Sequence, residues 1–469
     1  MARSSRRSNI TGMEENTLAI LESTEAKDSQ DANDDRIAFL EAVQAASIIP
    51  ENGTAPTCKM YEAVFQILRI GTSLELMMSS YELLNELDKR FPRVYVSEAS
   101  SDGSHELVVV DEAWSPFFLG SNVACSERKA GGEISSGPLD FSCFTLLIQE
   151  LVEVANGTKV KAIDTKHLRN MLLFQYLVSL LEGDFIPRNI VYEETINWAL
   201  LRESLLNMLL GSRRTNYKSL MKDCLSILCC LCPAHTGVIS GHGCPENSFR
   251  KPSEDCNTPL VFALLEVGKS SCIAMQKLLI MIMKLDISKK KADMQGLTTR
   301  ADGVRTPLMD IILDELTYDR DMLSPFLQVF SEPKWKLEIV VQYFLKYTTT
   351  KPSVCTRRSN SPKDDATFKG VLNCFSNSIS TKNIMKKIST DIVQLLLAHA
   401  FQAHLSMSYQ YNEGISDSKE EMRDSSLVEI CKNIICAFNS LRRTNGKVEI
   451  LPIGKEALFT AATILSTNS

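Results

Sequence analysis

The sequence has no apolar run long enough to cross a membrane. A membrane-spanning helix needs about 20 consecutive apolar residues, and even an apolar stretch such as Cys272 to Met283 contains Gln276 and Lys277. The basic start with Arg6 and Arg7 is followed by acidic residues, and an apolar segment typical of a secretory signal does not follow. We therefore expect neither membrane association nor secretion.

An excess of positive charge is also missing. The chain has 51 Lys and Arg residues against 57 Asp and Glu residues, which gives a formal net charge of −6. This balance excludes a protein whose whole surface binds nucleic acid, so any contact with DNA would need a local basic patch.

The 14 cysteines do not follow the regular spacing of a disulfide-bonded domain. Several of them, such as Cys224, Cys272, Cys431 and Cys436, lie inside helical patterns. Reduced cysteines in intracellular proteins are used in this way, as small hydrophobic residues.

The common catalytic patterns are absent. The sequence contains no His-Glu-x-x-His, Gly-x-Ser-x-Gly or Rossmann glycine pattern. The tripeptide Gly268-Lys269-Ser270 looks like the end of a phosphate loop, but Ala263 stands where the first glycine is needed and a helical pattern precedes it. We predict no enzyme, no cofactor and no small-molecule substrate.

A zinc site is the main chemical alternative. Potential ligands gather in one part of the chain, namely Cys224, Cys229, Cys230, Cys232, His235, His242, Cys244 and Cys256. The first four lie among leucines and isoleucines, as small core residues would. We therefore predict that no metal binds, while a metalloenzyme stays open as an alternative that metal analysis would test.

Hydrophobic periodicity is close to 3.6 residues along most of the chain, which predicts an all-α protein of about fifteen helices of 10 to 20 residues. Apolar residues share one helical face in three clear examples: Tyr61, Val64, Phe65 and Leu68; Trp198, Leu201, Leu205, Met208 and Leu209; and Leu337, Val340, Val341, Phe344 and Leu345. His399 falls on another such face, which predicts a buried histidine with satisfied hydrogen bonds.

Proline marks three predicted helix starts. Thr258-Pro259, Thr306-Pro307 and Ser324-Pro325 each place a capping hydroxyl before a proline at the first helical position. Only one segment reads as extended: Val94 to Val96 and Leu107 to Val110 flank Asp102-Gly103, which predicts a short β-hairpin attached to the helical body.

The predicted organisation is an N-terminal segment over residues 1–35, followed by a helical scaffold over residues 36–466. Segments rich in Ser, Gly, Asn and charge predict exposed loops at residues 120–138, 234–257, 348–365 and 410–424. Consecutive helices with short connections favour an irregular α-solenoid of the armadillo or HEAT type, in which each helix pair packs on the next.

One short segment concentrates positive charge. It predicts a basic loop that contains Lys289, Lys290, Lys291, Arg300 and Arg305. Such a loop is either a solvated surface or a contact for an acidic partner or DNA phosphates. Farther on, Trp335 lies near the start of a predicted helix over Pro333 to Tyr347, where it would anchor either the core or a partner.

Several blocks of the sequence resemble a plant family of negative regulators of systemic acquired resistance, the suppressors of non-expressor-of-PR-genes mutants. They extend from about Asn16 to Leu465, while the four predicted loops diverge. The blocks read KKKADMQGLTTRADGVRTP, ILDELTYD, PKWKLEIVVQYFLKY, STEAKDSQDANDDR, FPRVYVS with VVVDEAWSPF, YEETINWALLRESLLNMLL and VEILPIGKEALFTAA.

The resemblance implies a nuclear, armadillo-like scaffold without catalysis. Members repress defence genes and act in the DNA damage response and homologous recombination as an Nse-six-type subunit of the Smc five-six complex. Our first hypothesis is a scaffold that binds an Nse-five-type subunit and contacts DNA indirectly. The rival is a repressor that binds DNA directly through residues 289–305.

Overall fold

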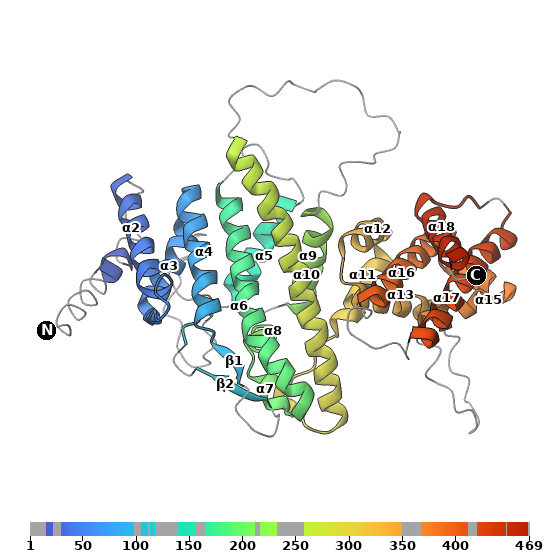
Figure 1. Ribbon diagram of the computed structural model, residues 1–469, viewed down its shortest axis with the longest axis horizontal. Helices are drawn as coiled ribbons and strands as arrows, with labels where there is room; N and C mark the ends of the chain where they lie inside the picture. Colours follow the sequence, from blue (N-terminus) through green and yellow to red (C-terminus); the bar gives the residue numbers. More distant parts are fainter. Residues whose placement is uncertain are drawn as a thin grey trace. The chain divides into compact units, whose positions relative to one another are not determined.

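A computed structural model places most of the chain (Figure 1). It describes residues 16–21, 30–97, 105–110, 113–117, 139, 141–155, 165–211, 216–231, 258–348, 367–410, 420–446 and 448–467. The chain forms two compact units, of which unit 1 is Met1–Ile311 and unit 2 is Ile312–Ser469. Each unit is described by itself.

Unit 1 is a stack of helices. In Figure 1, α2, α4, α6 and α10 follow one another as neighbours, and α3 packs on α4. Its helices are α2 (Gln30–Ser47), α3 (Cys58–Ile70), α4 (Leu74–Arg90), α5 (Phe141–Ala155), α6 (Thr165–Thr195), α7 (Trp198–Arg202), α8 (Leu205–Leu210), α9 (Tyr217–Leu231), α10 (Thr258–Met294) and the 3-10 turn η3 (Arg300–Asp302). The predicted boundary at residue 35 falls inside α2.

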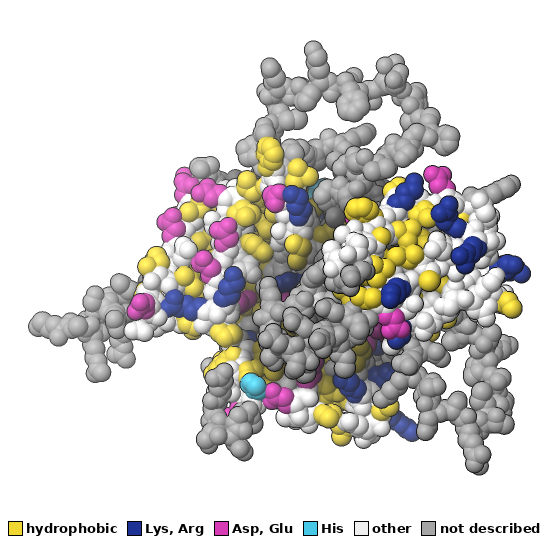
Figure 2. Space-filling view, turned by 45° about the vertical axis from the view of Figure 1, so that its right-hand side comes forward, with side chains coloured by type: hydrophobic (Ala, Val, Ile, Leu, Met, Phe, Trp, Pro, Cys, Tyr) yellow, Lys and Arg dark blue, Asp and Glu magenta, His cyan; other side chains and the backbone are white. Residues whose placement is uncertain are grey.

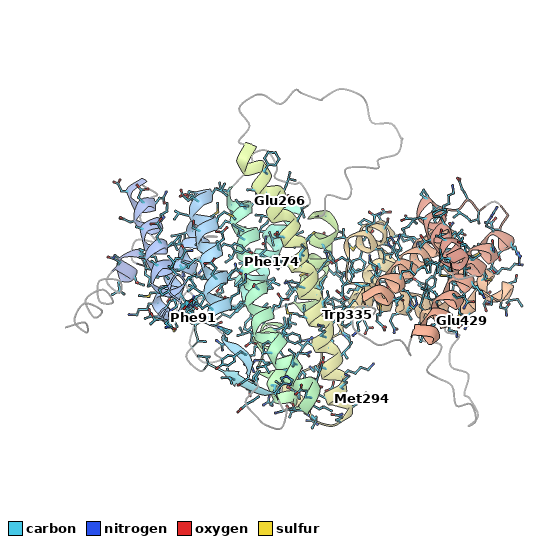
Figure 3. All side chains as sticks on the ribbon, in the orientation of Figure 1. Phe91, Phe174, Glu266, Met294, Trp335 and Glu429 are labelled. Atoms are coloured by element: carbon cyan, nitrogen blue, oxygen red, sulfur yellow. The ribbon has the colours of Figure 1, made fainter. Side chains whose placement is uncertain are left out.

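Helices α6 and α10 form the centre of unit 1 and run parallel. Three contacts fix their register along the chain. The Gln175 amide donates to the Val267 carbonyl at 2.9 Å, Lys277 pairs with Glu182 at 2.8 Å, and the Tyr192 hydroxyl donates to the Ser288 carbonyl at 2.7 Å. Phe174 is fully buried on α6 and lies in the interior of the unit in Figure 3.

The predicted hairpin is confirmed. Strand β1 (Val94–Ser97) pairs antiparallel with β2 (Glu106–Val109), with Val94 opposite Val109 and Ser97 opposite Glu106. Both strands contact α6, so the hairpin is attached to the helical body as expected.

The apolar stripe from Trp198 to Leu209 does not form one helix, contrary to the prediction. It is divided into α7 and α8, because Ser204 caps α8 by accepting the Asn207 N–H at 3.2 Å. The carboxylate of Asp184 on α6 accepts the Leu205 N–H at 2.7 Å. A buried acid from a distant segment therefore fixes where α8 begins.

Unit 2 is also helical, and the unit boundary falls inside α11. Within it, α13 packs on α16, and α18 packs on α16 and α17. The helices are α11 (Leu308–Tyr318), α12 (Arg320–Val329), α13 (Pro333–Thr348), α14 (Phe368–Cys374), α15 (Ser378–Lys387), α16 (Thr390–Gln410), α17 (Glu420–Thr444) and α18 (Pro452–Thr467). The all-α prediction with one short hairpin is confirmed.

Two predicted helix starts differ from the structure. Helix α12 begins at Arg320, because Asp319 accepts the N–H groups of Asp321 and Met322; Pro325 therefore lies inside the helix. Helix α11 begins at Leu308, whose N–H donates to Asp286 on α10 at 2.8 Å. A carboxylate thus performs the capping that the sequence analysis assigned to a hydroxyl in both cases.

Helix lengths and one loop also differ from the predictions. Helix α10 has 37 residues and α6 has 31, whereas α7 has only 5. Residues 420–424 of the loop predicted at 410–424 belong to α17. The remaining predicted loops lie almost entirely outside the described residues. In the described part of the chain, no helix is both long and apolar enough to span a membrane.

His399 is buried on α16, as predicted, but it is not satisfied. Neither ring nitrogen has a hydrogen-bond partner. Burial, followed by the charge of Lys336 on α13, lowers the pKa of His399 to about 4. The imidazole is therefore neutral at physiological pH.

Candidate functional site

The first part of the basic segment, through Met294, is helical, contrary to the prediction of a loop, while residues 295–299 and 303–305 are turn or coil. Lys289, Lys290 and Lys291 lie near the C-terminal end of α10, where positive side chains are favourable because of the helix dipole. The helix continues to Met294, because the apolar pattern of α10 persists through Ala292, which is fully buried.

Two of the five predicted cations take part in the fold. Arg305 pairs with Asp286 through Nε at 3.0 Å and Nη2 at 2.8 Å, and its guanidinium lies over the ring of Tyr217 at 5.5 Å. The Lys289 ammonium donates to the carbonyls of Asp302 and Gly303 at 2.7 and 2.6 Å. Burial, followed by the charge of Arg305, lowers the pKa of Lys289.

The connection after α10 is held in one conformation by Asp302. One carboxylate oxygen accepts the Thr299 N–H at 2.6 Å, and the other accepts the Trp198 indole N–H at 3.1 Å. Gly303 follows with φ of 64°, a conformation that glycine adopts readily. This arrangement leaves Lys290, Lys291 and Arg300 as the exposed cations of the predicted patch.

Trp335 lies in the first turn of α13, and only 5% of its surface is exposed. Its burial fits a core residue better than an exposed anchor. A role in partner binding stays a prediction, and Trp335 belongs to unit 2 while the basic patch belongs to unit 1.

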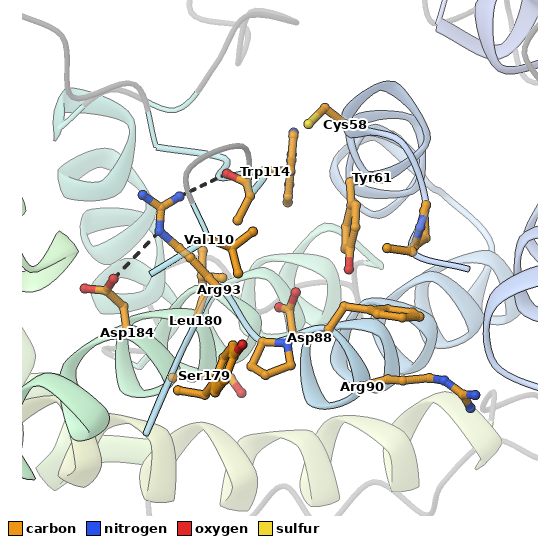
Figure 4. A pocket seen from close by; sticks show the side chains of 17 residues that line it. Cys58, Tyr61, Asp88, Arg90, Arg93, Val110, Trp114, Ser179, Leu180 and Asp184 are labelled. Atoms are coloured by element: carbon orange, nitrogen blue, oxygen red, sulfur yellow. Dashed lines mark hydrogen bonds and ion pairs between the residues drawn. The ribbon is translucent and has the colours of Figure 1, made fainter. Parts of the chain in front are cut away.

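Unit 1 also contains a cavity of about 420 Å³ that the sequence analysis missed (Figure 4). Aromatic rings form one wall: Trp114 stacks on Tyr61 with a centroid distance of 5.6 Å and contacts Phe65 edge-on at 5.4 Å. The lining comes from the start of α3, the end of α4, the hairpin and the middle of α6. No single sequence window contains these segments, although FPRVYVS and VVVDEAWSPF supply part of them.

The charged side chains at this cavity differ in their partners: the two arginines are bonded to other groups, whereas Asp88 is not part of an ion pair within the described part of the chain. Arg93 lies 3.7 Å from Asp184 and donates to the Ala113 carbonyl at 3.1 Å, while Arg90 donates to three backbone carbonyls before α3. Asp88 has no ion-pair partner among the described residues, and Figure 4 shows its carboxylate directed toward the space beside Tyr61. Burial raises the pKa of Asp88 to about 7, and the hydroxyl of Tyr176 acts in the opposite direction.

This cavity lacks the elements of a catalytic site in the part that the structure describes. The titratable neighbours of Asp88 are the hydroxyls of Tyr61 and Tyr176, whose pKa values burial raises, and the arginines are engaged in fixing the backbone. The arrangement is able to hold a small polar group against aromatic rings, but it does not indicate a reaction.

The predicted metal ligands are only partly described. Cys224 and Cys229 are buried on α9, as expected of core residues, whereas Cys230 is exposed, contrary to the prediction. Cys232 and the later cysteines and histidines of that set lie outside the described residues. Gly268-Lys269-Ser270 lies within α10, and its helical backbone cannot wrap a phosphate.

Comparison with known proteins identifies the family. Residues 93–332 match the SNI1 middle domain, and residues 349–469 match the SNI1 C-terminal domain. The chain is 50% identical over 461 residues to a protein of Arabidopsis thaliana named negative regulator of systemic acquired resistance SNI1, covering 97% of this chain and 95% of that protein. No solved structure matches the chain. The match to the middle domain covers more than half of the chain and the similarity to the Arabidopsis protein covers nearly all of it, so the chain belongs to the SNI1 family.

Proposed function

We propose that this protein is a negative regulator of systemic acquired resistance that acts as a non-catalytic helical scaffold in the nucleus. The identity of 50% with the Arabidopsis protein of that name extends over nearly the full length of both chains. A regulator of this kind works through the surfaces that it offers to partners, and its cavity and basic patch do not form a catalytic arrangement in the described residues.

The proposed partner is an Nse-five-type subunit, and through it the Smc five-six complex in DNA repair and homologous recombination. The observation that supports a partner is the exposure of large apolar side chains on helices that are otherwise well packed. Hydrophobic side chains reach the surface in several places on the face shown in Figure 2. Among those more than half exposed are Leu146, Phe262, Leu265, Ile273, Met294, Ile379 and Phe459. Where such side chains share one helix, as Phe262, Leu265, Ile273 and Met294 do on α10, they form apolar surface of the kind that binds another protein.

The rival function is direct DNA binding through residues 289–305. Five phosphate contacts would give a slope of about −4.5 for the logarithm of affinity against the logarithm of salt concentration, at roughly −0.9 per contact. Because Lys289 and Arg305 are bonded within the protein, three exposed cations would give a slope no steeper than about −2.7. We therefore favour the scaffold.

The deciding experiment compares the two ligands with the full chain. Binding of purified protein to an Nse-five-type subunit and to duplex DNA would be measured at several salt concentrations. We expect tight binding to the subunit. Binding to DNA should be weak, and its affinity should depend only slightly on salt concentration. A DNA slope of about −2.7 or steeper, lost in the Lys290→Glu/Lys291→Glu/Arg300→Glu variant, would favour the repressor instead.

The non-catalytic assignment has its own test in the metal content. We expect elemental analysis of the purified protein to find no stoichiometric zinc. One zinc per chain, lost on the Cys232→Ser change, would support a metal site and reopen the metalloenzyme alternative.

A further inference from the structure

The exposed face of α10 carries an unusual repeat. Apolar side chains recur there every seven residues, at Ile273, Ile280, Ile287 and Met294. Exposure is 56% for Ile273, 46% for Ile287 and 81% for Met294, and Ile280 is half-buried. These side chains are not needed to hold α10 in the unit, because its opposite face is buried against α6 and α9.

Lysines occupy the same face with the same period. Lys277, Lys284 and Lys291 are also seven residues apart, so each lies between two apolar members of the repeat. Lys277 pairs with Glu182 on α6, whereas Lys284 and Lys291 are exposed and have no ion-pair partner in the part of the chain that the structure describes. We call the seven residues from Ile273 to Met294 the α10 strip.

The spacing makes this strip continuous along the helix. A seven-residue repeat drifts by only about 20° per repeat on an α-helix, so the strip follows the axis of α10. It covers 21 residue steps, or about 32 Å at 1.5 Å per residue. Figure 3 shows Met294 at the far end of α10 from Glu266. An interface of this length fits three heptads of a partner helix.

Helix α6 extends the apolar surface on one side. Ile186 and Ile190 are both exposed, and they follow Glu182 at intervals of four residues. Since α6 and α10 run parallel and Glu182 pairs with Lys277, these isoleucines lie along the side of α10 that carries the α10 strip. The apolar surface is therefore wider than one helix.

We propose that the α10 strip docks an acidic amphipathic helix of the partner protein. This inference rests on the proposed scaffold function and names the kind of segment that binds. A heptad of apolar residues accepts apolar side chains of a second helix, and the lysines select glutamates on that helix. Duplex DNA is a poorer fit, since the isoleucines gain nothing from phosphates.

The test uses the full chain and two probes. One is the purified Nse-five-type subunit, and the other is a labelled three-heptad peptide with Leu at the a and d positions and Glu at e and g. The Ile280→Ser/Ile287→Ser and Lys284→Glu/Lys291→Glu variants should each bind both probes at least tenfold more weakly. The matched controls Ile49→Ser and Lys218→Glu, exposed elsewhere in unit 1, should stay within about twofold.

Exchanging the charges of the peptide and of the protein tests directly whether the lysines select an acidic helix. A peptide with Lys in place of each Glu should bind wild-type protein at least tenfold more weakly and regain affinity for Lys284→Glu/Lys291→Glu. Circular dichroism should show that all variants keep the helical content of the wild type. Equal binding of the acidic and basic peptides would overturn the proposed charge selection.

The outcomes separate this inference from the proposed function. Subunit binding that both strip variants leave unchanged refutes the α10 strip but keeps the scaffold. Peptide binding without subunit binding keeps the strip and refutes the proposed partner. If neither the subunit nor the peptide binds, both the α10 strip and the proposed partner are refuted. If duplex DNA competes with the peptide at equal affinity, DNA replaces the acidic helix as the proposed ligand.

Discussion

Arg305 and Asp286 link the end of α10 to the beginning of α11. Both Nε and Nη2 of Arg305 donate to one carboxylate oxygen of Asp286, and the other oxygen accepts the Leu308 N–H. One acid therefore neutralises a largely buried guanidinium and caps a helix. The pairing with Asp286 explains why Arg305 of the basic segment is unavailable to a partner.

Removal of that acid should be costly. Asp286→Ala leaves Arg305 unpaired and α11 uncapped, so we expect a loss of about 2–4 kcal/mol in the free energy of unfolding. Urea unfolding would measure it, with Asp314→Ala as the control, because the Asp314–Lys346 pair is exposed and is worth about 0–1 kcal/mol. Equal losses for the two variants would contradict the structural role of Asp286.

Gly454 should not tolerate a methyl group. A Cβ there would lie 2.9 Å from Phe438 and 3.0 Å from Ile450, so Gly454→Ala should destabilise unit 2 by about 1–3 kcal/mol. Gly268→Ala on α10 is the matched control, since a Cβ there has no neighbour within 4 Å. The control should be neutral or stabilise by about 0.5–1 kcal/mol in thermal unfolding.

Asp88 should make stability fall as pH rises. Its folded-state pKa is about 7, whereas an unfolded aspartate titrates near pH 3.8. Between these values the folded chain holds one more proton, so raising the pH destabilises it until about pH 7. Asp88→Asn should therefore gain stability relative to wild type at pH 8 but not at pH 4. Parallel curves of melting temperature against pH would contradict this, and Glu86→Gln on the same helix is the control.

His399 should act in the opposite direction. Its folded-state pKa of about 4 lies below the ordinary value of 6.5, so the unfolded chain binds a proton first as the pH falls. Stability is thus retained above pH 6.5 and lost between pH 6.5 and 4. His399→Leu should weaken that loss, because leucine does not titrate. The change forfeits no hydrogen bond, since the ring nitrogens have no partners. If wild type and His399→Leu lost the same stability between pH 6.5 and 4, a lowered pKa of His399 would be refuted.

Trp335 should behave as a core residue. Trp335→Ala should cost about 3–5 kcal/mol, as truncation of a buried tryptophan usually does. Ile379→Ala, at an exposed position of α15, should change stability by less than about 0.5 kcal/mol. A stable Trp335→Ala variant that no longer binds the Nse-five-type subunit would assign Trp335 to an interface instead.

Local patterns predicted those features that depend on local contacts. The hairpin of β1 and β2 and the helical face of Tyr61 to Leu68 were predictable, because alternation and periodicity are properties of a few adjacent residues. The start of α11 was predicted to within one residue, but its capping group, Asp286, was not predictable, because it comes from another helix. The division between α7 and α8 has the same cause, through Asp184.

The candidate sites were likewise predictable only where they depend on residues close together in the sequence. Positive charge at residues 289–305 was visible in the sequence, but the distinction between exposed Lys291 and engaged Arg305 needed the fold. The cavity at Asp88 combines four separated segments, and no spacing in the sequence predicts it. The seven-residue repeat of α10 was present in the sequence, but only burial of the other faces shows which residues remain exposed.

Asp184 limits how unit 1 can be divided into fragments. Its carboxylate lies 3.7 Å from Arg93 before the hairpin, 3.2 Å from Arg188 on α6 and 2.7 Å from the Leu205 N–H of α8. A fragment that omits either the hairpin or α8 would leave part of this buried acid without its partners. An independently folding fragment of unit 1 must therefore retain residues from before the hairpin to the end of α8.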